Sequence, residues 1–291
     1  MNYYKDKVVM VTGASSGLGL SLLRCLLGVE GCLVIASTRS PEKLRTLVKT
    51  WGISKPTCQY ISIDLDSRDR DISEAVKLAF GIHGRVNVLI NCAGMGFRGC
   101  VSDTGIDIDR RVMQVDYFGQ IAIIKALLSL WNQSDASCGD IIQISSVQGF
   151  FGLGERAPYS AAKHALLGFI DSLRVEIDSF PAPSRFKVIH VCPGHIATNH
   201  SVNSIKADGT PYAAQDESTL AGYSPEFVAS QTLARAALGV REIIIADMKV
   251  QMLMLIRTLF PLLCFRLLRN KQMGRKESFV RTVFSWMLDR T

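Results

Sequence analysis

Short runs rich in β-branched residues alternate with stretches of helical length along most of this chain. Such alternation predicts βαβ crossovers, which place parallel strands in one sheet that helices bury on both faces. We expect seven strands, at 7–12, 32–37, 58–63, 86–90, 140–145, 186–192 and 242–246. Helices are expected at 18–27, 41–49, 68–80, 106–130, 158–179 and 225–238. The pattern therefore predicts a doubly wound α/β fold, in a single domain over residues 1–247.

The segment 196–224 lacks a clear hydrophobic period and is rich in small and polar residues. A loop of this length inside a compact domain is usually functional. We expect a lid over a binding site, and the alternative is a solvated excursion without a function.

The formal charge of +7 lies entirely in the carboxyl-terminal part of the chain. Residues 249–291 contain nine Lys or Arg and two acids, so the rest of the chain keeps 24 of the 33 basic residues and 24 of the 26 acidic ones. A neutral body with a basic, apolar tail favours contact with an anionic membrane surface. A nucleic-acid partner is not expected, because it would need a basic face on the folded domain.

The tail at 248–291 is predicted to be an apolar and basic helical extension. Its apolar stretch from 250 to 268 is interrupted by Arg257, Pro261 and Arg266. A membrane-spanning helix needs ~20 apolar residues with few charges, so an interfacial or re-entrant helix pair fits this tail better. We therefore expect contact with a membrane, and the alternative is packing on the domain or on a second subunit.

The eight cysteines are scattered, without a CxxC pair or a histidine at the spacing of zinc ligands. We expect reduced thiols and no metal site. The opening Met1–Lys7 is polar and shows no signal-peptide pattern. These features predict a protein that faces the cytosol.

The first predicted strand ends in a glycine-rich turn, TGASSGLG, and a helical pattern follows at once. Glycines there allow a tight turn and let the backbone close on a pyrophosphate at the positive end of the helix. This strand–turn–helix context predicts a Rossmann-type dinucleotide site. Its residues are Gly13, Ser15, Ser16, Gly17, Leu18 and Gly19.

The second predicted strand leads to Arg39 and has no acid at its tip. An acid at this point selects NAD, whereas a basic residue accommodates the 2′-phosphate of NADP. Arg39, helped by Ser15 or Ser16, therefore favours NADP(H) as the cofactor.

Tyr159 and Lys163 stand four residues apart in a predicted helix and so share one face. A cation within ~6 Å stabilises a phenolate and lowers the tyrosine pKa from about 10 toward working pH. Such a tyrosine can protonate a carbonyl oxygen or deprotonate an alcohol. Ser146, at the carboxyl end of its strand, can hold that oxygen by a hydrogen bond. We predict that all three residues are catalytic and that Ser146 and Tyr159 also bind the substrate.

The glycine spacing, the Tyr159–Lys163 pair and a serine thirteen residues before the tyrosine resemble the short-chain dehydrogenase/reductase family. The resemblance covers about residues 5–247. It implies hydride exchange between a nicotinamide and a carbonyl or alcohol, and a homodimer is a further expectation because relatives often pair. It also implies further cofactor contacts from Asp64, Asn91, Ala93, Gly94, Tyr159, Lys163, Pro193, Gly194, Ile196 and Thr198.

Asp116 departs from the family pattern, which implies an Asn that holds a water for proton relay. An Asp can hold the same water, but its charge competes with Tyr159 for Lys163 and can raise the tyrosine pKa. We include Asp116 among the catalytic residues and expect reduced turnover or a shifted pH optimum. Two interpretations stay open: an NADP(H)-dependent oxidoreductase, and a nucleotide-binding, membrane-associated scaffold with weak or no catalysis.

The segment 196–199 and the tail at 257–261 are similar to the member 7B/7C branch of this family. The similarity implies a lipophilic substrate, such as a steroid, a retinoid or a lipid precursor like acyl-dihydroxyacetone phosphate. It also implies the endoplasmic reticulum membrane, with peroxisomes or lipid droplets as alternatives. Members of the branch usually begin with a membrane anchor that the polar opening does not resemble. We therefore expect either attachment through the carboxyl end alone or a shorter form of the chain.

Overall fold

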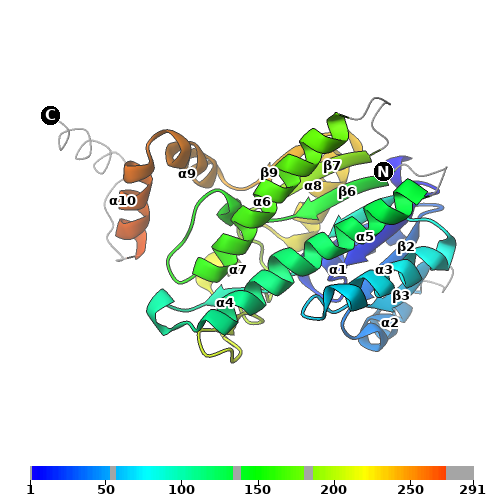
Figure 1. The fold of residues 1–291 in the computed structure, drawn as a ribbon, viewed down its shortest axis with the longest axis horizontal. Coiled ribbons are helices and arrows are strands. Elements are labelled where there is room, and N and C mark those ends of the chain that lie inside the picture. Colours follow the sequence, from blue (N-terminus) through cyan, green and yellow to red (C-terminus); the bar gives the residue numbers. More distant parts are fainter. Residues whose placement is uncertain (1, 53–56, 134–138, 180–185, 273–291) are drawn as a thin grey trace.

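The computed structural model describes residues 2–52, 57–133, 139–179 and 186–272. A parallel sheet of seven strands, ordered β3-β2-β1-β4-β6-β7-β9, forms its centre (Figure 1). The strands are β1 (Val8–Thr12), β2 (Leu33–Thr38), β3 (Cys58–Ser62), β4 (Val88–Asn91), β6 (Gly139–Ile144), β7 (Phe186–Pro193) and β9 (Glu242–Ile245). The seven predicted strands are confirmed, because each begins and ends within two residues of its expected bounds.

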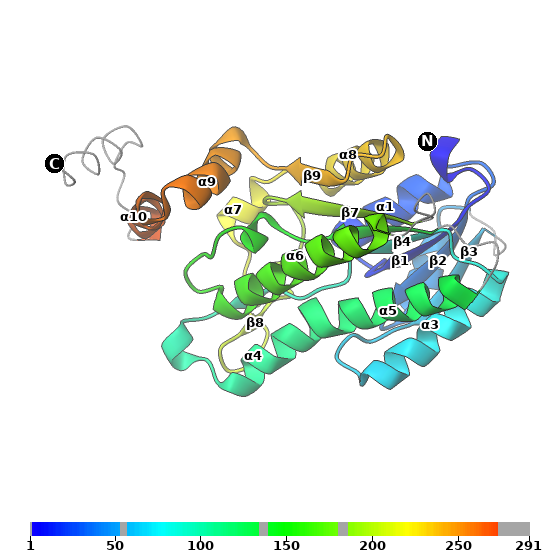
Figure 2. The same cartoon turned by 45° about the horizontal axis from the view of Figure 1, so that its top comes forward.

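Helices cover both faces of the sheet (Figures 1 and 2). Those on one face are α1 (Gly17–Leu27), α2 (Pro41–Lys49) and α8 (Pro225–Ala237). Those on the other face are α3 (Asp69–His83), α5 (Gly119–Gln133) and α6 (Ala157–Asp178). Alternate strand residues divide between the two cores: Val9 and Val11 of β1 join the first, and Val8 and Met10 join the second. This burial on both sides confirms the doubly wound class.

The order of the strands reverses at β1, which pairs with β2 on one side and with β4 on the other. In sheets of this kind, ligands bind in the crevice at the carboxyl ends of the strands beside such a reversal. The fold therefore places the binding site above the ends of β1 and β4.

The single helix predicted over 106–130 is wrong. The structure has α4 (Ile106–Met113), a π-helical segment at Gln114–Phe118, and then α5. The wider turn carries the buried side chain of Asp116, and π-helical turns of this kind often occur at functional sites. Hydrophobic periodicity did not reveal it, because one wider turn hardly alters the apolar stripe of a long helix.

The segment 196–224, expected to be a lid without secondary structure, contains two short elements. Its β8 (Ile205–Lys206) pairs with β5 (Phe97–Arg98) in a separate two-stranded sheet. Its α7 (Glu217–Leu220) follows further on. Phe97 and Ile205 pack with Ile108 of α4 in a small core of their own, so the segment is anchored beside the crevice.

Two helices follow the last strand, α9 (Met248–Leu259) and α10 (Pro261–Gln272), and both lie beyond the edge of the sheet (Figures 1 and 2). Met254 of α9 packs against Phe151, which ties the pair to the domain. Ile256 and Leu263 pack the two helices against each other. Among the described residues, no helix combines the length and the apolar character needed to cross a membrane.

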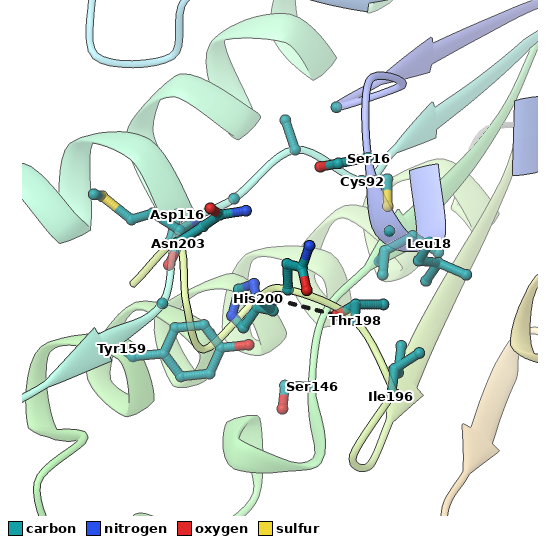
Figure 3. Close-up of a pocket in the computed structure, with 18 of the residues that line it drawn as sticks. Ser16, Leu18, Cys92, Asp116, Ser146, Tyr159, Ile196, Thr198, His200 and Asn203 are labelled. Atoms are coloured by element: carbon teal, nitrogen blue, oxygen red, sulfur yellow. Dashed lines mark hydrogen bonds between the residues drawn. The ribbon is translucent and has the colours of Figure 1, made fainter. Parts of the chain in front are cut away.

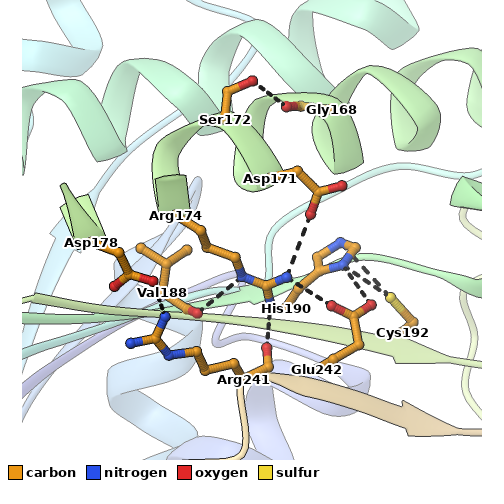
Figure 4. A network of polar contacts seen from close by, with 10 residues as sticks. All are labelled: Gly168, Asp171, Ser172, Arg174, Asp178, Val188, His190, Cys192, Arg241 and Glu242. Carbon is orange, nitrogen blue, oxygen red and sulfur yellow. Dashed lines mark hydrogen bonds and ion pairs between the residues drawn. The ribbon is translucent and has the colours of Figure 1, made fainter. Parts of the chain in front are cut away.

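A polar network ties the edge strand β9 to β7 and α6 (Figure 4). Arg174 of α6 donates to Glu242 Oε2 at 2.8 Å and to the carbonyl of Val188 at 3.3 Å. Glu242 Oε1 lies 3.5 Å from His190 Nδ1, and Cys192 Sγ lies 3.3 Å from the same nitrogen.

His190, Cys192 and Glu242 are residues that can ligate metals, and their ligand atoms lie within 4.8 Å of one another. The sequence predicted no metal site from ligand spacing, which cannot reveal an acid supplied by a neighbouring strand. Because Arg174 and His190 already contact both oxygens of Glu242, we assign this network a structural role at the edge of the sheet.

Candidate active site

A pocket of about 1220 Å³ lies at the carboxyl ends of the strands. The glycine-rich turn and the first turns of α6 line different parts of it, and Thr198, at the start of the 196–224 segment, lies next to Gly17 of the turn. Figure 3 shows this arrangement, with Ser16 and Leu18 at one end and Ser146 and Tyr159 at the other.

Two glycines of the turn permit close backbone contacts that a larger residue would prevent. Gly13 has a φ of 66°, and a Cβ there would lie 2.8 Å from Ala93 Cα. A Cβ on Gly19 would lie 2.2 Å from the carbonyl oxygen of Gly13. The helix α1 begins directly after Ser16, whose side chain does not cap it. The first N–H groups of α1 therefore suit an anion such as a pyrophosphate.

The loop after β4 is held against β1 by Thr12. Its Oγ1 accepts hydrogen bonds from the backbone N–H groups of Cys92 (2.9 Å) and Ala93 (3.0 Å) and donates to Asn91 Oδ1 at 3.0 Å. Asn91 is fully buried and also donates to Gln143 at 3.0 Å. Asn91, expected to contact the cofactor, therefore lies behind the pocket lining and supports the loop that forms it.

The other residues expected to bind the cofactor all line the pocket. They are Gly13, Ser15, Ser16, Gly17, Leu18, Gly19, Arg39, Asp64, Ala93, Gly94, Tyr159, Lys163, Pro193, Gly194, Ile196 and Thr198. The glycine turn and Arg39 thus lie where a dinucleotide would be bound, and the residues present fit such a cofactor.

The three groups expected to transfer and hold the proton lie together in one wall of the pocket. Tyr159 is in the first turn of α6, and Lys163 Nζ lies 5.3 Å from the centroid of its ring. Ser146 follows β6, and its hydroxyl accepts from the backbone N–H of Gln148 at 3.2 Å. In Figure 3 the phenol of Tyr159 projects into the pocket beside Ser146 and His200.

Asp116 lies directly beside the lysine. Its Oδ1 is 3.5 Å from Lys163 Nζ and accepts a hydrogen bond from the backbone N–H of Met95 at 2.9 Å. Its Oδ2 has no hydrogen-bond partner within the described parts of the chain. Both charged side chains are buried, with 0% exposure for Asp116 and 5% for Lys163. Asp116 and Lys163 therefore form a buried pair next to the catalytic phenol.

The pKa values of this group reflect burial and a shared lysine. Burial raises the pKa of Asp116 by more than Lys163 and the Met95 N–H lower it. Burial lowers the pKa of Lys163, but attraction to Asp116 and Tyr159 outweighs this and raises it. Burial also raises the pKa of Tyr159, against the lowering by Lys163, and the charge of Asp116 raises it further. The expected lowering of the tyrosine pKa by the lysine is thus present but outweighed.

His200 is a residue of the pocket that the sequence argument missed. Its ring centroid lies 6.0 Å from that of Tyr159, in an edge-to-face arrangement. Burial, together with the charges of Arg98, Lys163 and Arg156, lowers the pKa of His200 to about 4. The imidazole is therefore neutral at pH 7, and the surrounding charge in this part of the pocket is positive.

Residues 7–208 match the family model described as short chain dehydrogenase. The chain belongs to the short-chain dehydrogenase family. It is accordingly an NAD(P)-dependent oxidoreductase that acts on CH–OH groups, as the Tyr159–Lys163 geometry suggests.

Relatives in this family include dehydrogenase/reductase SDR family member 7B of Danio rerio, which is 35% identical over 282 residues. That match covers 94% of this chain and 89% of the relative. Member 7B of Bos taurus is 36% identical over 280 residues, which cover 94% and 83% of the two chains. The resemblance to the 7B branch is therefore confirmed.

Solved structures share the fold. A short-chain dehydrogenase of Streptomyces avermitilis superposes with a TM-score of 0.72 at 25% identity, over 94% of this chain and 98% of that chain. An enzyme of Burkholderia cenocepacia in complex with NADP gives a TM-score of 0.69 at 23% identity, over 94% and 100%. A short-chain dehydrogenase/reductase of Burkholderia phymatum in complex with NAD gives a TM-score of 0.75 at 18% identity, over 96% of this chain and 98% of that chain. Because the neighbours hold either nucleotide, they leave the cofactor preference of this chain open.

The substitution Asp116→Asn tests the role of the buried pair. It removes a charge that raises the pKa of Tyr159, so the limb of the pH–rate profile set by the tyrosine should move to lower pH. The measurement is kcat/KM against pH in both reaction directions. Asp71→Asn, which removes an exposed carboxylate paired with Arg68, should leave the profile unchanged. Identical profiles for the unmodified chain and Asp116→Asn would contradict the idea.

Proposed function

We propose that this chain is an NADP(H)-dependent oxidoreductase of a lipophilic carbonyl or alcohol. The observation that carries the proposal is the meeting of Tyr159, Lys163 and Ser146 in one wall of a pocket that the glycine turn and Arg39 also line. A proton donor therefore faces the space where a nicotinamide would lie.

The chemistry follows from these positions. Bound nicotinamide supplies the exchange of a hydride with the carbonyl carbon. In the direction of reduction, Tyr159 donates its phenolic proton to the carbonyl oxygen, and Ser146 holds that oxygen by a hydrogen bond. The ammonium group of Lys163 stabilises the phenolate that remains. In the direction of oxidation, the same phenolate removes the proton of an alcohol.

A lipophilic substrate is supported by apolar side chains that line the pocket outside the glycine turn, namely Met95, Leu153, Val202, Ile205, Pro211 and Leu268. The branch of the family supports the same class, which includes steroids, retinoids and lipid precursors such as acyl-dihydroxyacetone phosphate.

The homodimer expected from relatives remains a prediction.

Tyr159→Phe tests catalysis. Loss of general acid and base chemistry should lower kcat/KM with lipophilic ketones by roughly 10²- to 10⁴-fold. NADPH affinity should change far less, because most of the expected cofactor contacts come from other residues. NADPH consumption and NADPH fluorescence titration measure the two quantities. Tyr60→Phe on β3, outside the pocket lining, serves as the control. Tight NADPH binding without turnover in the unmodified chain would instead favour the scaffold interpretation.

The NADP(H) preference is supported by Arg39, which follows β2 and lines the same pocket as Ser15 and Ser16 of the turn. A guanidinium there can pair with the 2′-phosphate that distinguishes NADP from NAD.

Arg39→Ala should raise the Kd for NADP⁺ roughly tenfold or more, since hydrogen bonds to charged groups contribute about 1.5–3 kcal/mol. The Kd for NAD⁺ should not change. Titration calorimetry with both nucleotides measures the effect. Arg45→Ala, on α2 and paired with Glu42, is the matched control. An equal loss for the two nucleotides would contradict the assignment of Arg39.

We further propose that α9 and α10 bind a membrane surface, on the cytosolic face of the endoplasmic reticulum. Four exposed side chains, Met248, Met252, Leu255 and Leu259, recur at the spacing of one face of α9. Basic residues of the same helices suit anionic headgroups. Because Leu268 of α10 also lines the pocket, a lipophilic substrate could pass directly from that surface to the site.

Leu255→Glu should weaken binding to vesicles of phosphatidylcholine and phosphatidylserine, because it places a charge in the apolar face of an interfacial helix. Flotation of the full chain with such vesicles measures binding, which should also fall as salt is added. Leu78→Glu changes a leucine on α3 that is even more exposed, at 69% against 52% for Leu255, and should have no effect. Equal flotation of the two variants would contradict the proposed surface.

A further inference from the structure

Three charged side chains from distant parts of the sequence meet beside the pocket. Arg98 belongs to β5, Arg156 immediately precedes α6, and Asp216 immediately precedes α7. Arg98 Nη2 lies 2.5 Å from Asp216 Oδ2, and Arg156 Nη2 lies 3.3 Å from the same oxygen. The three side chains are only 11%, 18% and 15% exposed. In this largely buried cluster, two arginines pair with one carboxylate.

The hydrogen bonds of the cluster leave donors for a ligand. Arg98 donates to Asp216 through Nε and Nη2, and to its own neighbour Phe97 through Nη1. Arg156 donates to Asp216 and to the backbone carbonyl of Glu155 at 3.1 Å. A guanidinium has five N–H donors, so Arg156 keeps three beyond its bonds within the described residues.

The two arginines face the pocket, whereas the described lining does not include Asp216. Arg98 and Arg156 therefore reach the pocket, and the carboxylate that they share is outside its described lining. Glu155 also lines the pocket, but its side chain is exposed and its backbone φ is 58°. Near the phenol, Arg98 lowers the pKa of Tyr159, and both arginines contribute to the low pKa of His200. The field of both guanidiniums thus reaches the catalytic end of the pocket.

We propose that Arg98 and Arg156 bind the anionic group, a phosphate or a carboxylate, of an amphiphilic substrate whose carbonyl lies at Tyr159. Arginine forks match these oxyanions in geometry and bind them by short, charge-assisted hydrogen bonds. A neutral steroid or retinoid would leave the two cations facing an uncharged ligand. This inference rests on the proposed function, and it narrows the substrate class to molecules with an acidic headgroup and an apolar tail.

A purely structural role makes a different prediction. Because Asp216 belongs to the 196–224 segment, the cluster also fastens that segment to β5 and to the start of α6. If the cluster served only to fasten the segment, loss of an arginine would weaken the binding of neutral and anionic ligands alike. If the cluster is an anion site, loss of an arginine removes only the preference for anionic over neutral ligands.

Titration calorimetry on the full chain saturated with NADP⁺ separates these roles. The probes are octanoate, octyl phosphate and 1-octanol, which share one apolar tail. At least one anion should bind roughly tenfold or more tightly than 1-octanol, as expected for hydrogen bonds to charged groups. The stronger of the two anions identifies the headgroup as a carboxylate or a phosphate.

Arg156→Gln should lower the affinity for the anion to that for 1-octanol. The affinity for 1-octanol itself should not change. Arg98→Lys, which keeps the charge but loses the fork, should give a partial loss and provides a second variant if Arg156→Gln does not fold. Arg68→Gln removes an arginine from an exposed pair with Asp71 and should keep the full preference.

The proposal is overturned if the unmodified chain binds the three probes equally or binds neither anion. It is also overturned if Arg156→Gln still binds an anion more tightly than 1-octanol, or if this substitution weakens the binding of 1-octanol as much as that of the anions. Since these readouts require no turnover, a chain that binds the anion but reduces no ketone would refute the proposed function alone.

Discussion

The chemistry of this site depends on one buried lysine that is shared between two partners. Lys163 Nζ lies 3.5 Å from Asp116 Oδ1 and 5.3 Å from the ring centre of Tyr159. Removing two charges from water costs on the order of several kcal/mol per ion, so such a pair persists only where attraction and hydrogen bonds compensate. Met95 provides one such bond to Asp116. Burial raises the pKa of Tyr159 most, Lys163 lowers it, and the charge of Asp116, which competes for the same cation, raises it further.

The fold brings these groups together at a place where parallel sheets commonly bind ligands. The strand order reverses at β1, and the loops after β1, β4 and β6 therefore open into one crevice. A π-helical turn places Asp116 in the same crevice, and the first turn of α6 brings Tyr159. The small sheet of β5 and β8 adds Arg98 from the side. One pocket thus combines a phosphate cradle, a proton donor and a cluster of cations.

Much of the fold and part of the site could be predicted from local pattern. The seven strands were found because strands buried on both faces are nearly continuous apolar runs. The relation of Tyr159 to Lys163 was found because helical spacing fixes which residues share a face. Periodicity could not show the π-helical turn at Gln114–Phe118, and a family motif could not show that Asn91 lies behind the lining. The cluster of Arg98, Arg156 and Asp216 was missed because its members lie 58 and 118 residues apart from Arg98 in the chain and carry no common motif.

By itself, the sequence determined the class of fold, the glycine cradle and the pairing of a phenol with an ammonium group. Each of these depends on residues that are close along the chain, and backbone geometry converts such spacing directly into position. The charge of Asp116 near Lys163 was expected from the family resemblance, but only the tertiary structure showed that Arg98 and Arg156 reach the same pocket from separate elements. Electrostatic interactions depend on distance and burial in space, and neither can be derived from separation along the sequence.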